Sequence, residues 1–271
     1  MATTTDRYQQ MFTALESKNQ GAFVPFVMVG DPDKNTSVNI IKALVEGGAD
    51  ALELGFPFSD PIADGPTIQQ ASIRALSHNI KTTDCFAIIS EVRAAYPDIP
   101  IGLLLYSNLV FKRGIKQFYL DAAKAGVDSI LIADVPLREA EPFINVANTV
   151  GIKQILIAPP NASEETLAQI GQQSQGYTYL LGRAGVTGAE TAAATPTHEL
   201  IAKLTRHKVA PPLLGFGISK PEHVKAAIES GAAGAISGSA IVQIIEKYQA
   251  EPAQLKQQLF DFVSSMKAAT L

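Results

Sequence analysis

Short apolar runs alternate with amphipathic segments along the whole chain. The first amphipathic segment, over residues 5–17, has apolar residues at helical spacing and predicts an N-terminal helix. The apolar runs that follow are bounded by glycine, proline or polar residues, which is typical of buried strands. They predict eight strands, at 22–30, 51–55, 99–106, 127–133, 154–158, 177–181, 212–216 and 233–237.

Amphipathic segments separate these strands and predict the helices between them. Glycines follow several of these segments, as at Gly47 and Gly48, at Gly126 and at Gly151, where glycine commonly ends a helix. The predicted helices cover 37–46, 66–77, 83–95, 114–125, 138–149, 163–173, 196–207, 221–230, 240–248 and 252–268.

Strands that alternate with helices form parallel sheets, because each helix returns the chain to the start of the next strand. Eight such units in about 250 residues are typical of a closed (β/α)8 TIM barrel. No linker-like stretch interrupts the pattern. We therefore expect one α/β TIM-barrel domain over residues 1–271, with an extra N-terminal helix and additional short helices. A doubly wound open sheet is the alternative.

Composition narrows the classes of function. The net charge is −4 and no basic cluster occurs, which argues against a nucleic-acid partner. Cys85 is the sole cysteine, and with four scattered histidines it forms no metal-ligand spacing. The N-terminus lacks a signal pattern, and no apolar run approaches the roughly 18 residues that span a bilayer. We expect a soluble, cytoplasmic protein without a metal.

The strand predicted over 51–55 carries one carboxylate. Because strand side chains alternate between faces, Glu53 points away from the face of Leu52 and Leu54. An unpaired charge costs several kcal/mol inside a parallel sheet covered on both faces, so packing gives no reason for Glu53. It is the best candidate for an acid–base group with a pKa tuned by burial. A solvent-facing Glu on an edge strand is the alternative.

Three further carboxylates follow predicted strands, at the end where barrel enzymes place their active sites. Asp31 and Asp134 lie beside or near prolines, so we expect them to form turns. Asp64 precedes Gly65 and Pro66 at the start of a predicted helix. It is a second candidate for chemistry, and capping of that helix is the alternative role.

Glycine-rich turns follow the last three predicted strands, within 181–188, 215–219 and 237–240. Backbone N–H groups at a helix N-terminus bind anions, and barrels commonly hold a phosphate after strands seven and eight. The pattern favours a phosphorylated substrate, although the glycines could serve tight turns alone. Lys220 replaces the third glycine of a dinucleotide motif, so no nicotinamide cofactor is expected.

The long segment 182–195 consists mostly of small residues and has no apolar periodicity, which is typical of a lid, with plain surface disorder as the alternative. Apolar residues near the strand ends could form a pocket for a flat aromatic group, although each alone could also fill the core. They are Phe26, Leu104, Tyr106, Leu131, Tyr179 and Phe216.

Several motifs resemble those of the tryptophan synthase alpha chain family. They occupy 51–66, 176–181, 185–189, 215–218 and 234–239, and the likeness runs from about 21 to 267. The first motif is highly specific, whereas the glycine motifs occur in many phosphate-binding barrels. Two departures stand out: Gly182 replaces an expected serine, and Phe56 replaces a smaller aliphatic residue.

The resemblance implies a lyase of tryptophan biosynthesis. Its reaction is the retro-aldol cleavage of indole-3-glycerol phosphate to indole and D-glyceraldehyde 3-phosphate, with no cofactor in this chain. Glu53 would protonate indole C3 and take the proton of the side-chain hydroxyl. Asp64 would serve the ring nitrogen. The implied phosphate ligands are Gly188, Gly217, Gly238 and Ser239.

The same resemblance implies further roles. Tyr179 would help to position the Glu53 region, and Thr187 would steady Asp64 when the loop closes. Phe26, Leu104 and Phe216 would line the indole pocket.

The family works with a beta chain that carries pyridoxal phosphate and receives indole through a tunnel, so an alpha2-beta2 tetramer is implied. The expected contact is an exposed loop over 56–61, with Pro57, Phe58 and Asp60. Two alternatives stay open from the residues alone. One is an isomerase or aldolase of another sugar phosphate, and the other is a catalytically silent subunit that activates a partner.

Overall fold

All eight predicted strands are present, and the fifth is divided in two. The computed structural model describes residues 6–182 and 198–271. Within these ranges the strands are β1 (Ala22–Met28), β2 (Leu52–Gly55), β3 (Ile101–Leu105), β4 (Ser129–Ile132), β5 (Lys153–Gln154), β6 (Leu156–Ala158), β7 (Thr178–Leu181), β8 (Pro212–Gly215) and β9 (Gly234–Ser237).

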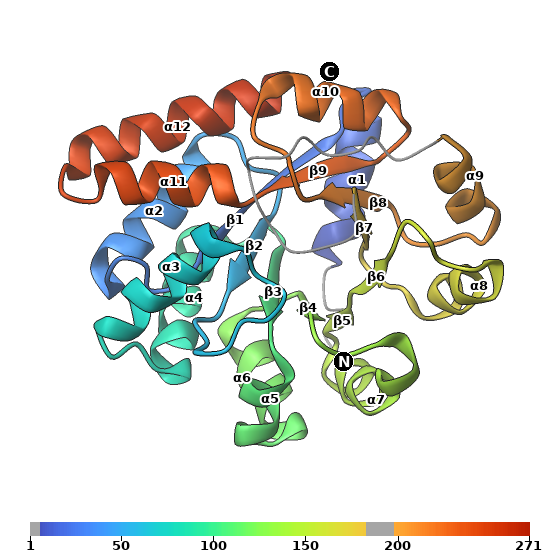
Figure 1. Cartoon of the computed structure of the whole chain (residues 1–271), viewed down its shortest axis with the longest axis horizontal. Coiled ribbons are helices and arrows are strands. Elements are labelled where there is room, and N and C mark those ends of the chain that lie inside the picture. Colours follow the sequence, from blue (N-terminus) through green and yellow to red (C-terminus); the bar gives the residue numbers. More distant parts are fainter. Residues whose placement is uncertain (1–5, 183–197) are drawn as a thin grey trace.

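Helices surround these strands (Figure 1). They are α1 (Arg7–Glu16), α2 (Lys34–Glu46), α3 (Pro66–Ser77), α4 (Thr82–Ala95), α5 (Ser107–Arg113), α6 (Ile115–Ala125), α7 (Glu141–Val150), α8 (Glu164–Gln173), α9 (His198–Arg206), α10 (Pro221–Glu229), α11 (Ser239–Tyr248), α12 (Pro252–Ala268) and the 3-10 helix η1 (Leu137–Glu139). The helices predicted from the sequence do not include α5. The predicted helix 138–149 begins later, at Glu141, because η1 precedes it.

Every strand pair in the sheet is parallel, in the order β5-β4-β3-β2-β1-β9-β8-β7-β6. Two seams join its halves. At β1, residues 22–25 pair with β9 and residues 26–28 pair with β2. At the other seam, β5 pairs with β4, and β6 pairs with β7 just after Ile155. The two half-sheets close into the predicted TIM barrel, and the open sheet is excluded.

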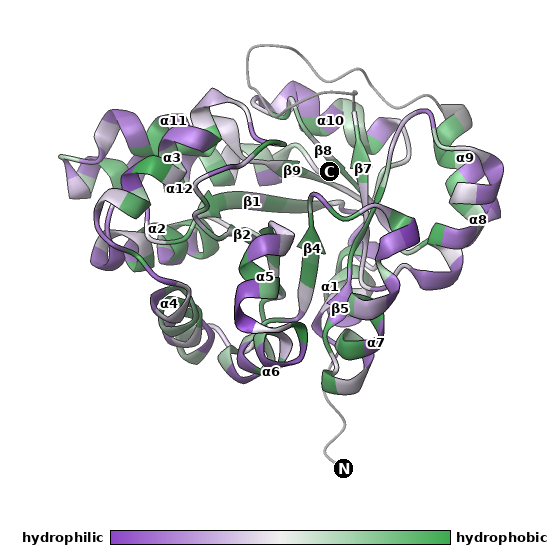
Figure 2. Ribbon diagram, turned by 60° about the horizontal axis from the view of Figure 1, so that its bottom comes forward, coloured by the Kyte–Doolittle hydropathy of each residue, from purple (hydrophilic) through white to green (hydrophobic). Residues whose placement is uncertain are grey.

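Strands such as β1 and β4 are coloured mostly as hydrophobic, whereas the helices carry both hydrophobic and hydrophilic residues (Figure 2). The burial follows this pattern, since all residues of β1, β2, β4 and β9 are buried. No helix within 6–182 or 198–271 combines the length and the apolar character that crossing a membrane requires.

The N-terminal helix α1 closes the barrel at the N-terminal ends of the strands. Arg7 forms an ion pair of 2.8 Å with Asp128, directly before β4, and Lys153 of β5 forms one of 2.7 Å with Asp6. Between these contacts the Tyr8 side chain enters the barrel, where its hydroxyl lies 2.8 Å from the hydroxyl of Ser129. The opposite end of the barrel is therefore the one left to hold a site.

Candidate active site

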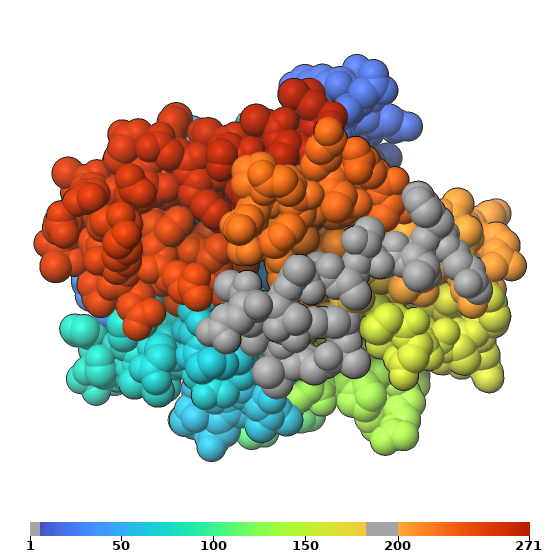
Figure 3. Space-filling model, turned by 45° about the horizontal axis from the view of Figure 1, so that its top comes forward, coloured from blue at the N-terminus to red at the C-terminus, as the bar shows by residue number. Residues whose placement is uncertain are grey.

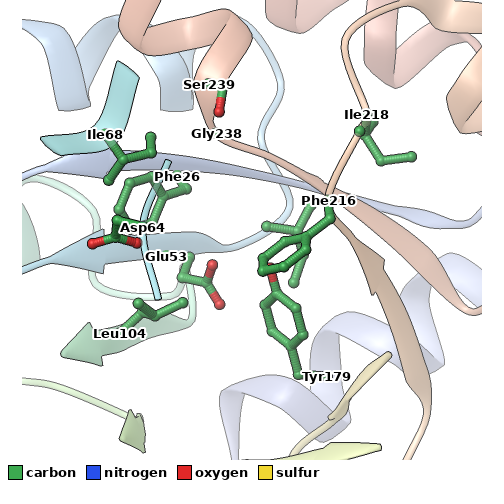
Figure 4. Close-up of a pocket in the computed structure, with 12 residues that line it drawn as sticks. Phe26, Glu53, Asp64, Ile68, Leu104, Tyr179, Phe216, Ile218, Gly238 and Ser239 are labelled. Carbon is green, nitrogen blue, oxygen red and sulfur yellow. The ribbon is translucent and has the colours of Figure 1, made fainter. Parts of the chain in front are cut away.

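A cavity lies at the C-terminal ends of the strands and brings together residues from both ends of the chain. The space-filling view shows the loop after β2, in blue and cyan, on the same face as α10 and α11, in orange and red (Figure 3). The cavity is lined by Phe26, Glu53, Asp64, Ile68, Leu104, Tyr179, Phe216, Gly217, Ile218, Ile236, Gly238 and Ser239 (Figure 4).

Glu53 points into the barrel, as the alternation along β2 predicts. Its residue is only 2% exposed, and its carboxyl points into the space between Leu104 and Phe216 (Figure 4). The Tyr177 hydroxyl donates a hydrogen bond of 2.8 Å to Oε1 of Glu53. Burial raises the pKa of Glu53 to about 7, and the bond from Tyr177 offsets part of that rise. Near neutral pH the carboxyl therefore exists in both protonation states, as proton transfer in both directions requires.

Asp64 also faces the cavity, and its residue is 6% exposed. The alternative role of helix capping does not apply, because Gly65 is the N-cap residue of α3 and no side chain caps that end. Burial raises the pKa of Asp64 to about 6, whereas a hydrogen bond with Tyr106 lowers it. The carboxyl is thus available to a ligand and is more acidic than Glu53.

The turns after β8 and β9 form one wall of the cavity. Phe216 and Gly217 both have positive φ, 71° and 73°, which turns the chain sharply after β8. Ser237 secures this turn, because its buried hydroxyl donates to the carbonyl of Ile218 at 2.6 Å. Helix α11 begins at the next turn, after Gly238, with no side chain capping its N-terminus. Its first N–H groups are left to bind an anion.

Gly238 lies close to the Phe26 ring beside this helix end. A Cβ on Gly238 would lie 3.1 Å from Cδ1 of Phe26, closer than most real contacts of this kind, so the ring would have to shift by a few tenths of an ångström to admit it. Glycine thus lets the backbone pass close to the cavity wall without displacing Phe26. Of the residues predicted to bind phosphate, Gly217, Gly238 and Ser239 line the cavity. Gly188, also predicted to bind phosphate, and Thr187 lie outside the described residues.

The apolar wall contains four of the predicted aromatic and aliphatic residues. Phe26, Leu104, Tyr179 and Phe216 line the cavity, and the Tyr179 and Phe216 rings meet edge to face at 6.2 Å. Leu131 does not line it. Tyr106 lies beside it instead, where its hydroxyl accepts a hydrogen bond of 3.1 Å from the Ala63 N–H.

Sequence reasoning missed three apolar wall residues, Ile68, Ile218 and Ile236. Alternation could have revealed Ile236, which lies two residues before Gly238 and so shares its face.

It also missed Tyr177. The family resemblance implies that Tyr179 positions the Glu53 region. Among the described residues, however, the hydrogen bond to Glu53 comes from Tyr177. Strand side chains two residues apart share a face, so Tyr177 and Tyr179 point to the same side. This spacing could have identified Tyr177 as a second candidate beside Glu53.

The other two carboxylates near strand ends hold neighbouring segments together. Asp31 accepts two hydrogen bonds of 2.8 Å from the guanidinium of Arg74 in α3. Asp134 accepts bonds of 2.8 Å from the backbone N–H and the hydroxyl of Ser107, at the start of α5. Neither lines the cavity. Both lie in backbone turns after their strands, as expected, but their side chains bond to other segments and not within the turn.

The loop over 56–61 is only partly exposed, so the expectation of an exposed loop is wrong at its start. Phe56 and Pro57 are buried, Phe58 is half-buried, and Asp60 is exposed. Phe56 packs in an aromatic cluster, 5.3 Å from the ring of Phe86. The larger residue at position 56 therefore packs in the core of this chain.

The exposed part of this region continues beyond the predicted loop. Ile62 is 77% exposed, an unusual degree for a large apolar side chain. Phe58 stacks on the ring of Tyr106 at 5.4 Å. The surface next to Asp64 is thus partly apolar.

Metal-binding chemistry finds no support in the part of the chain that the structure describes. Within it, no group of three or more His, Cys, Asp or Glu residues is placed to hold an ion. Cys85 is buried and unpaired.

Comparisons with known proteins show the family of the chain. The family model of the tryptophan synthase alpha chain matches residues 12–271. The tryptophan synthase alpha chain of Shewanella oneidensis is 58% identical over 264 residues, which cover 97% of this chain and 95% of that protein. The crystal structure of tryptophan synthase subunit alpha from Legionella pneumophila has a TM-score of 0.87 at 31% identity, covering 98% of this chain and 99% of that one.

A chain of the tryptophan synthase α2β2 complex from Pyrococcus furiosus has a TM-score of 0.81 at 36% identity, covering 92% of this chain and 98% of that one. The match to the family model spans nearly the whole chain, and so does the identity to a curated member. The chain therefore belongs to the tryptophan synthase alpha chain family.

Proposed function

We propose that the cavity at the strand ends cleaves indole-3-glycerol phosphate, with Glu53 and Asp64 as its acid–base pair. In this family the alpha reaction is that cleavage, which yields indole and D-glyceraldehyde 3-phosphate and makes the chain a lyase of tryptophan biosynthesis. One observation carries the assignment of residues. A fully buried Glu53 with a pKa of about 7 shares an apolar cavity with Asp64 and an uncapped helix N-terminus.

The substrate has three parts, and each has a counterpart in the cavity. We propose that the indole ring lies between the apolar side chains of Phe26, Leu104 and Phe216, which line the cavity. The phosphate fits the backbone N–H groups at Gly217 and at the start of α11. The glycerol carbons then lie beside Glu53.

The first step is a proton exchange on the ring. Protonated Glu53 gives its proton to indole C3, and the Asp64 carboxylate takes the proton of the ring nitrogen. The ring becomes the indolenine tautomer, in which C3 is tetrahedral. The order of the two pKa values supports these starting states, since Asp64 ionises more readily than Glu53.

In the second step the carbon–carbon bond breaks. Glu53, now a carboxylate, takes the proton of the hydroxyl on the carbon attached to C3. The C3–carbon bond breaks, the aldehyde forms, and the bonding electrons return to the ring. The nitrogen takes its proton back from Asp64, so indole leaves and both carboxyls are restored.

This mechanism predicts a narrow pH optimum for kcat/KM. Asp64 is ionised above a pH of about 6, and Glu53 is protonated below about 7. As the pH rises through about 7, Glu53 loses the proton that C3 needs, so the rate falls. We expect a bell-shaped profile with its maximum between about pH 6 and 7 in assays of indole release. A profile still rising at about pH 8 would contradict a protonated Glu53 as the starting state.

The partner is a beta chain in an alpha2-beta2 complex, and the pyridoxal phosphate of the system belongs to that beta chain. We propose the surface of Phe58, Asp60 and Ile62 as part of the docking site, because it lies directly beside the Asp64 loop. We also propose the cytoplasm as the compartment, which fits a single buried cysteine without a disulfide.

Incubating the purified chain with indole-3-glycerol phosphate and following indole release tests the function. Slow release that rises when the beta chain is added is the expected result. An isomerase of another sugar phosphate, or a silent subunit, would release no indole under either condition, and that result would overturn the proposal.

A further inference from the structure

The floor of the barrel contains a tyrosine that none of the strands supplies. Tyr8 belongs to α1, outside the barrel repeat, yet its residue is only 2% exposed. Its hydroxyl lies 2.8 Å from that of Ser129, the first residue of β4. In most barrels, residues from the strands fill this layer. Here a side chain from a separate helix fills it.

Two glycines make the room that Tyr8 occupies. A Cβ on Gly102 of β3 would lie 3.0 Å from the Tyr8 hydroxyl and 2.8 Å from Oγ of Ser129. A Cβ on Gly176 would lie 3.3 Å from Cδ2 of Tyr8. Gly102 is also the residue that pairs with Glu53 across β2 and β3. The Tyr8 hydroxyl therefore lies beside Gly102, the residue that pairs with Glu53 on the neighbouring strand.

Tyr8 contacts the residue that holds Glu53. Its ring packs against the ring of Tyr177, with centroids 5.5 Å apart and planes tilted by 51°. Tyr177 in turn donates its hydroxyl to Oε1 of Glu53 at 2.8 Å. The chain of contacts thus runs from α1 through two aromatic rings to the carboxyl.

We propose that Tyr8 is a positioning residue for Glu53, which keeps the Tyr177 hydroxyl on the carboxyl and closes the barrel floor to water. The inference rests on the proposed role of Glu53 as the acid–base group. The ion pairs of Asp6 and Arg7 hold α1 against the strand starts on either side of Tyr8.

Within 6–182 and 198–271, few other groups that titrate near neutral pH surround Glu53. Tyr8 faces it from α1, Tyr177 and Tyr179 from the β7 segment, and Asp64 lies across the cavity near Tyr179. Burial raises the pKa of all three tyrosines, so they stay neutral. On the far side of Tyr8 lie Asp128 and Arg93, which pair with each other at 2.7 Å.

Tyr8→Ala tests the proposal, because it opens a polar space under Glu53 that water can fill. Hydration weakens the effect that raises the pKa of Glu53, so the carboxyl should ionise at lower pH. We expect its titration midpoint, and the alkaline limb of kcat/KM, to move down by about one pH unit. The infrared carbonyl band of the protonated acid, assigned by its absence in Glu53→Gln, reports the titration directly.

Two further variants separate positioning from loss of stability. Leu15→Ala removes a buried side chain from the same helix and should lower the melting temperature without moving either midpoint. Tyr8→Phe keeps the ring and removes the hydroxyl, so it should shift the midpoint less than Tyr8→Ala does. Tyr8→Leu serves if Tyr8→Ala does not fold, and it should shift the midpoint in the same direction by a smaller amount.

The outcomes of these experiments support or overturn the positioning role of Tyr8. An unmoved infrared midpoint in Tyr8→Ala, or in Tyr8→Leu as its substitute, overturns the proposal. An equal shift in Leu15→Ala also overturns it, because any loosening of α1 would then suffice. If the infrared midpoint moves but the rate profile does not, Tyr8 positions Glu53 as proposed, and the failure lies in the catalytic role given to Glu53.

Discussion

Glu53→Gln should lower kcat for the cleavage of indole-3-glycerol phosphate by about 10²- to 10⁴-fold, the usual effect of removing an acid–base group. The amide has nearly the same shape and can still accept a hydrogen bond from Tyr177. It can neither give a proton to C3 nor take one from the hydroxyl. The loss should therefore appear in kcat and leave substrate affinity nearly unchanged.

Steady-state assays of indole release at about pH 6.5, near the expected optimum, measure this effect. Circular dichroism should show an unchanged fold, and glycerol 3-phosphate should bind as well as to the wild type. Glu165→Gln, an exposed glutamate on α8, is the matched control and should keep full activity. Substantial residual turnover in Glu53→Gln would remove Glu53 from the mechanism.

Arg74→Leu should lower the free energy of unfolding by about 3 kcal/mol, because it leaves Asp31 buried without its partner. The Asp31 side chain is fully buried, and that of Arg74 is 16% exposed. Burial raises the pKa of Asp31, and the guanidinium of Arg74 lowers it. The partial exposure of Arg74 places the expected loss at the lower end of the range for buried pairs.

Urea denaturation at neutral pH measures this loss. Arg138→Leu is the control, because the Arg138–Glu139 pair is 84% and 67% exposed and its removal should change stability little. The double variant Asp31→Asn, Arg74→Leu should regain part of the loss, since no charge is then stranded. Equal stability of Arg74→Leu and the wild type would show that Asp31 does not need this partner.

The strands and most helices could be predicted from sequence because the signals are local. Alternation along β2 placed Glu53 inside, and the glycines at 126 and 151 do end helices in the left-handed conformation. The break at Ile155 could not be predicted. It arises because consecutive residues of one strand pair with different neighbours, which is a property of the closed barrel and not of the segment.

The candidate site shows the same limit. The sequence could name Asp64, but whether it caps α3 depended on the backbone, which gives that place to Gly65. The sequence predicts an exposed loop over 56–61, whereas the three-dimensional packing places Phe56 against Phe86. The helical spacing of apolar residues over 5–17 predicts that Tyr8 is buried, but not what it contacts. Its contact with Ser129 spans 121 positions in the chain, and only the fold reveals it.

The two halves of the sheet supply different parts of the proposed site. Glu53 and Asp64 come from the half built by the first strands, whereas Gly217 and Gly238 come from the half built by the last ones. The proposed acid–base pair and the proposed phosphate ligands therefore come from separate stretches of the sequence, and Tyr177 of the later stretch joins the two by its hydrogen bond to Glu53.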